Sequence, residues 1–61
     1  MKKDTLEKFF QERAAINKSA FAKEAGISRQ YLLMLLNGER PFTDTVTAKL
    51  KEQMKRYGYD V

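Results

Sequence analysis

The chain has 61 residues, carries 12 Lys and Arg against 8 Asp and Glu, and contains neither cysteine nor histidine. It therefore has no thiolate nucleophile and no disulfide, and it lacks the commonest general base and the usual nitrogen ligand of zinc. The carboxylates form no tight cluster along the sequence. We expect one small domain over residues 1–61 that is not an enzyme and has no catalytic, cofactor or metal site. The net charge of +4 suits a polyanionic partner.

The first residues, Met1-Lys2-Lys3, resemble the charged start of a secretory signal. Asp4 and Glu7 follow at once, however, and no apolar stretch comes after them. Since the chain also has no cysteine and no apolar run long enough to cross a membrane, we expect a soluble cytoplasmic protein. Strand patterning is absent, so we predict helices only.

Apolar side chains at three- and four-residue spacing predict a first helix over about residues 4–15, capped by Asp4 or Thr5. Its apolar face consists of Leu6, Phe9 and Phe10. A second helix is predicted over about residues 18–25, with Asn17 as its N-cap. Its inward side chains are Phe21, Ala22 and Ala25.

A turn is predicted at Gly26-Ile27-Ser28, where Gly26 tolerates a positive φ and Ile27 enters the core. Ala22 is small enough for a close helix crossing. Ser28 is expected to cap a third helix over residues 29–37, which Gly38 ends.

Residues 39–42 are predicted to form a loop because Pro41 lacks an amide hydrogen. A fourth helix follows from residue 43 or 44 to residue 56 or 57, and Gly58 ends it. Its apolar stripe consists of Val46, Leu50, Met54 and Tyr57. In the tail over residues 59–61, Tyr59 and Val61 are expected to pack on their own domain, as is Tyr57.

The third helix is apolar on more than one side. At about 100° per residue, its inward face gathers Leu32, Leu35 and Leu36. The opposite arc holds Arg29, Gln30, Leu33, Met34 and Asn37, with Tyr31 at the flank. A domain of this size cannot bury the whole helix, so we expect the second arc to face a partner.

That outer arc has the chemistry of a DNA-reading surface. Arg29 can donate two hydrogen bonds to guanine, Gln30 can pair with adenine, and Leu33 and Met34 can lie against thymine methyl groups. For Leu33 and Met34, contact with a protein partner is an equally good interpretation. The residues expected to contact phosphates are Asn17, Lys18, Ser28, Asn37 and Arg40.

The string F-A-x-x-x-G-I-S followed by L-x-x-L-x-N-G resembles the phage-repressor-like helix-turn-helix family, which includes the Cro proteins. The resemblance covers about residues 5–57, with the helix-turn-helix over about residues 18–37. It implies an all-α, compact lambda-repressor-like domain of four helices, or of five as in larger members. It also implies base contacts from Arg29, Gln30, Leu33 and Met34, and backbone contacts from Lys18 and Asn37.

The sequence departs from the family in three respects. Many relatives carry polar or small residues where this chain has Leu33 and Met34, and relatives often place proline nearer the fourth helix than Pro41 lies. An acidic residue and its arginine partner in some relatives correspond here to Leu36 and Gln11, so that apolar packing replaces a buried ion pair.

The function expected from these features is that of a DNA-binding transcriptional regulator, a phage or prophage Cro-like repressor that places residues 29–37 in the major groove of an operator. A weak homodimer, or a dimer formed on DNA, would occupy a pseudo-palindromic site. The alternative is an antitoxin or anti-repressor that binds a protein through the Leu33/Met34 face.

Overall fold

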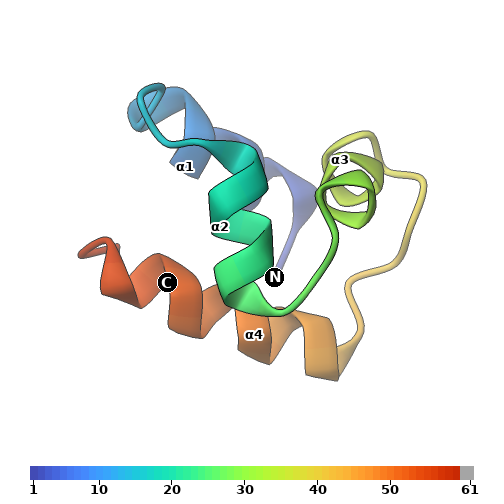
Figure 1. Cartoon of the computed structure of the whole chain (residues 1–61). Coiled ribbons are helices and arrows are strands. Elements are labelled where there is room, and N and C mark those ends of the chain that lie inside the picture. The colour runs from blue at the N-terminus through green and yellow to red at the C-terminus, as the bar shows by residue number, and fades with distance from the viewer. Residues whose placement is uncertain (60–61) are drawn as a thin grey trace.

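Four helices make up the described part of the chain, residues 1–59, in the computed structural model (Figure 1). They are α1 (Lys3–Glu12), α2 (Lys18–Ala25), α3 (Arg29–Leu36) and α4 (Asp44–Arg56). No strand and no fifth helix occurs within residues 1–59, so the prediction of a four-helix, all-α domain is confirmed. None of the helices in this part of the chain has the length and apolarity that crossing a bilayer requires.

Helix α2 lies at the centre of the arrangement. It packs against both α3 and α4, while α1 packs against α3. Figure 1 shows α2 crossing α4 steeply, with α3 to one side and the loop after α3 descending to the start of α4. Ala22 on α2 has no exposed surface, as expected for a small residue at a close crossing.

The core takes side chains from all four helices, because each contributes one apolar stripe. Its buried members are Leu6, Phe9, Phe10, Phe21, Ala22, Leu32, Leu35, Val46, Leu50 and Met54. The rings of Phe9 and Phe10 lie edge to face at 5.2 Å, and Phe21 from α2 packs on both. Ile27 was predicted to enter the core. It packs against the core but is only half-buried.

Three of the helix starts are capped by side chains, and two of these caps, Asn17 and Ser28, were predicted from the sequence. Asn17 Oδ1 accepts from the backbone N–H groups of Ser19 and Ala20, at 2.9 and 3.2 Å. At α3, Ser28 Oγ accepts from Tyr31 N–H at 3.0 Å. At α4, Thr43 Oγ1 accepts from the N–H of Val46 at 3.3 Å. These bonds satisfy backbone donors that a helix leaves free at its first turn.

The first helix begins within one residue of its predicted start, but its predicted cap and its predicted end were wrong. Lys2 is the residue before α1 and makes no side-chain cap, so neither Asp4 nor Thr5 caps it. At the other end, α1 stops at Glu12 instead of residue 15. The C-cap Arg13 is followed by two exposed alanines, Ala14 and Ala15, and a bond from Ile16 N–H to Arg13 carbonyl O closes a turn there.

The remaining ends agree with the sequence to within one residue. Helix α3 ends at Leu36, with Asn37 as its C-cap, where the prediction had residue 37. Gly26 follows α2 with φ +84°, in the left-handed region that favours glycine. Tyr59 packs against the core, and the ring of Tyr57 packs on Phe9 and Phe21 while 37% of the residue stays exposed. The prediction for Val61 lies outside the described residues.

Candidate nucleic-acid interface

Helix α3 divides into a buried arc and an outer arc. Leu32 and Leu35 have no exposed surface, and Tyr31 and Leu36 are half-buried and pack against the core. At about 100° per residue these four side chains occupy one side of the helix. The short turn over residues 26–28 fixes this orientation, because it brings α3 against α2 directly after the chain leaves Gly26.

The outer arc contains the side chains predicted to contact bases. Arg29 and Gln30, in the first turn of α3, are exposed. Leu33 and Met34 are half-buried, yet neither belongs to the core cluster nor to the half-buried apolar residues that pack against it. Leu33 and Met34 are therefore not part of the core of the described chain. Their outward surfaces remain open to a partner.

A basic hollow of about 390 Å³ adjoins this arc where the end of α1 meets the start of α2. Its lining contains three cationic side chains and no carboxylate. The residues that line it are Phe10, Arg13, Ala14, Ile16, Asn17, Lys18, Ser19 and Arg29. Because the N-terminal end of α2 adds the positive end of its dipole, this is an electropositive part of the surface.

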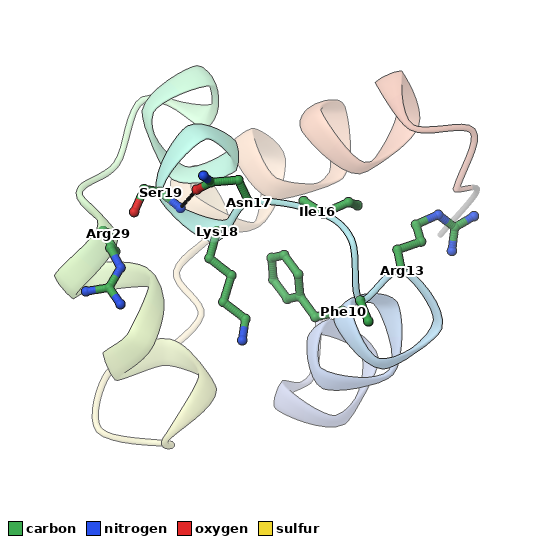
Figure 2. Close-up of a pocket in the computed structure, with 8 residues that line it drawn as sticks. Phe10, Arg13, Ile16, Asn17, Lys18, Ser19 and Arg29 are labelled. Carbon is green, nitrogen blue, oxygen red and sulfur yellow. Dashed lines mark hydrogen bonds between the residues drawn. The ribbon is translucent and has the colours of Figure 1, made fainter.

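Figure 2 separates the cations of the basic hollow into two groups. Lys18 extends from the start of α2 into the space between α3 and α1, and its Nζ lies 5.6 Å from the centre of the Phe10 ring, while the side chain of Arg29 lies along α3. Arg13 contributes its stem, while its guanidinium points away from the other two. It lies over the rings of Phe9 and Tyr59, at 5.2 and 4.7 Å from their centroids. The charged groups of Lys18 and Arg29 therefore lie on the α2 and α3 side of the hollow, apart from that of Arg13.

A second depression, the α1–α3 groove, has a volume of about 350 Å³. Its lining residues are Glu7, Phe10, Gln11, Lys18, Leu33, Leu36 and Asn37. Gln11 and Leu36, the positions of an ion pair in some members of the family that the sequence resembles, both lie here. Leu36 packs against the core while Gln11 stays exposed, so no buried charge needs a partner at this point.

The residues predicted to contact phosphates lie at both ends of α3. Asn17 and Lys18 share the basic hollow with Arg29, and Asn37 lies with Lys18 along the α1–α3 groove. The oxygens of Asn17 and Ser28 accept the capping bonds, so toward a phosphate the amide and hydroxyl hydrogens of these side chains remain to donate. Arg40 is exposed in the loop after α3 and lines neither depression.

The roles of two polar residues, one in the basic hollow and one buried on α4, were not predicted from the sequence. Arg13 lines the basic hollow, and its place one turn after Phe9 indicated that it would lie beside an aromatic ring. Gln53 is only 2% exposed, and its Oε1 accepts from Arg56 Nη1 at 3.2 Å. Gln53 lies three residues after Leu50, which places it on the apolar stripe of α4. Its polar amide group is instead typical of an exposed residue.

Comparison with known proteins identifies no relative: no family model, curated protein or solved structure matches the chain.

Proposed function

We propose that this protein is a sequence-specific DNA-binding transcriptional regulator, a Cro-like repressor with the lambda-repressor-like helix-turn-helix fold. In this proposal α2 and α3 form the helix-turn-helix, and the outer arc of α3 lies in the major groove of an operator. Arg29 and Gln30 contact bases through hydrogen bonds, and Leu33 and Met34 contact them through apolar atoms.

The observation that carries the proposal is the combination of an unburied outer arc with cations beside it. No acidic residue occurs between Arg29 and Asn37, and Lys18 and Arg29 line a hollow without a carboxylate. A duplex presents its base edges between two rows of phosphates. Helix α3 offers base-reading side chains on its outer arc, with Lys18 beside it and Asn37 and Arg40 after its C-terminal end.

One recognition helix contacts too few base pairs for high specificity. We therefore expect two copies of the chain on a pseudo-palindromic site, with half-site centres about 34 Å apart. We expect the dimer to be weak, or to form only on DNA. The resulting regulator would act in the bacterial cytoplasm, associated with the nucleoid through the DNA that it binds.

The test is selection of preferred duplexes from a random pool, followed by mobility-shift titration of the wild type and two variants. Arg29→Ala should lose about 1–3 kcal/mol of preference for the selected sequence over random DNA. Lys18→Ala should weaken binding to all duplexes alike and reduce the salt slope by about one. Equal losses on selected and random DNA in the Arg29 variant would contradict its base-reading role.

A second function, from another class, is favoured by the α1–α3 groove. Phe10, Leu33 and Leu36 give this groove apolar walls that suit a side chain of a protein partner, as in an antitoxin or anti-repressor. Binding of that kind would change little with salt, whereas phosphate contacts weaken steeply as salt rises. A stoichiometric protein partner, with no DNA bound at low salt, would favour this second function.

A further inference from the structure

The outer arc of α3 changes its chemistry along the helix. Its first turn carries the hydrogen-bonding side chains of Arg29 and Gln30, both exposed. The next turn presents only Leu33 and Met34 on this arc, and the following polar side chain there is Asn37, after the helix has ended. The middle of α3 therefore has no donor or acceptor with which to recognise a base edge.

Apolar side chains in the major groove have one specific partner among the bases. The C5 methyl group of thymine projects into this groove, while cytosine has a hydrogen at the same position. A cytosine methylated at C5 presents the same methyl group there. An apolar pair distinguishes methylated from unmethylated pyrimidines because only the methyl group buries additional apolar surface against it.

Charge favours DNA over a protein as the occupant of this arc. The chain has a net charge of +4, and α3 contains no acidic residue. The side chain of Lys18 lies on the same side as Leu33, since both line the α1–α3 groove, and Arg29 stands one turn before Leu33. An apolar patch bordered by cations is complementary to base methyl groups that lie between phosphate rows.

We infer that Leu33 and Met34 recognise the C5 methyl groups of pyrimidines, so that the protein senses cytosine methylation within its site as well as thymine. This inference rests on the proposed DNA-binding function and specifies how part of the sequence is recognised. It assigns hydrogen-bonded recognition to Arg29 and Gln30 and methyl recognition to the turn that follows them.

The experiment uses the full chain and the best duplex from the selection, at one fixed salt concentration. Each thymine is replaced singly by deoxyuridine, which removes the methyl group and leaves every hydrogen-bonding group in place. At contacted positions the affinity should fall about fourfold per methyl group, and at flanking positions it should not change. At a contacted position that carries cytosine, 5-methylcytosine should raise the affinity by a similar factor.

Variants identify the side chains responsible. Leu33→Ala and Met34→Ala should each bring the thymine-to-deoxyuridine affinity ratio toward one at the positions that they contact. Leu36→Ala is the matched control, because it shortens a half-buried leucine of the same helix that packs against the core. It should lower the melting temperature and leave the ratio unchanged. Circular dichroism verifies that each variant is folded at the assay temperature.

The outcomes separate this inference from the function on which it rests. Ratios that collapse in the Leu33 or Met34 variant, and persist in the Leu36 variant, support methyl recognition. Sequence-specific binding with no deoxyuridine effect, or with an effect unchanged in both variants, overturns the inference while the regulator function stands. Failure to bind any duplex at low salt overturns both.

Discussion

The guanidinium of Arg13 lies over the ring of Tyr59, with its Cζ atom 4.7 Å from the ring centroid. Arg13 is the C-cap of α1, and Tyr59 follows the turn that ends α4, so this contact joins two distant parts of the chain. The Tyr59 ring also meets Phe9 edge to face at 5.1 Å. Residues beyond α4 therefore contribute to the packing of α1.

Replacing Tyr59 by leucine should lower the free energy of unfolding by about 1–2 kcal/mol, because it removes one aromatic pair and one cation–π contact. Thermal unfolding followed by circular dichroism measures the effect. Tyr57→Phe is the control, since it keeps the ring beside Phe9 and removes only a hydroxyl that donates to Glu24 Oε1 at 3.5 Å. Equal stability of the Tyr59 variant and the wild type would show that the contact contributes nothing in solution.

Enlarging Ala22 should destabilise the domain more than any change on the exposed side of α2. The residue is fully buried where α2 packs on its neighbours, and added methyl groups in a filled core typically cost about 1–3 kcal/mol. We expect Ala22→Leu to reduce the urea midpoint accordingly. Ala20→Leu makes the same chemical change at an exposed position of the same helix and should be close to neutral. Similar midpoints for both variants would refute a tight crossing at Ala22.

Helices with a strong capping residue and a strong stop were predictable to within one residue. Asn17 and Ser28 are good N-caps, and Gly26 supplies the left-handed turn, so the bounds of α2 and the start of α3 follow from local chemistry. Helix α1 has neither signal. Its helix-forming alanines after Arg13 bury nothing, and the need to reverse toward α2 ends the helix early.

The sequence predicts which residues of α3 face outward, but not the hollows that surround them. Helical periodicity alone places Leu33 and Met34 opposite Leu32 and Leu35, as the structure has them. The convergence of Lys18 and Arg29 on one hollow depends instead on the angle between α2 and α3 and on the position of α1. Spacing along the sequence does not specify those tertiary relationships.

Gly26→Ala should lower stability by about 1 kcal/mol through backbone strain alone, because its φ of +84° is costly for a residue with a Cβ atom. The added Cβ meets nothing closer than Lys49 Nζ at 4.0 Å, so a clash does not contribute. Gly26→Asn should cost less, since asparagine tolerates the left-handed region better than alanine. Chemical denaturation of the two variants compares them, and an alanine variant at least as stable as the asparagine variant would contradict this origin of the cost.

Substitutions of Asn17 can separate its role as the N-cap of α2 from its proposed role in DNA binding. Asn17→Asp should keep the bonds to Ser19 and Ala20 N–H and should not reduce stability, since aspartate is an equally good N-cap and its charge suits the helix dipole. The same substitution places a carboxylate in the hollow shared by Lys18 and Arg29. If phosphates bind there, affinity for all duplexes should fall, with little change in sequence preference.

Asn17→Ser is the matched control, because serine retains a capping oxygen without adding charge. Its melting temperature and its affinity for DNA should both stay near those of the wild type. Mobility-shift titrations of the three proteins on the same selected and random duplexes, combined with their thermal unfolding, give both quantities. An Asn17→Asp protein that binds DNA as tightly as the serine variant would place the phosphate path elsewhere on the surface, because a carboxylate in the hollow would repel a phosphate bound there.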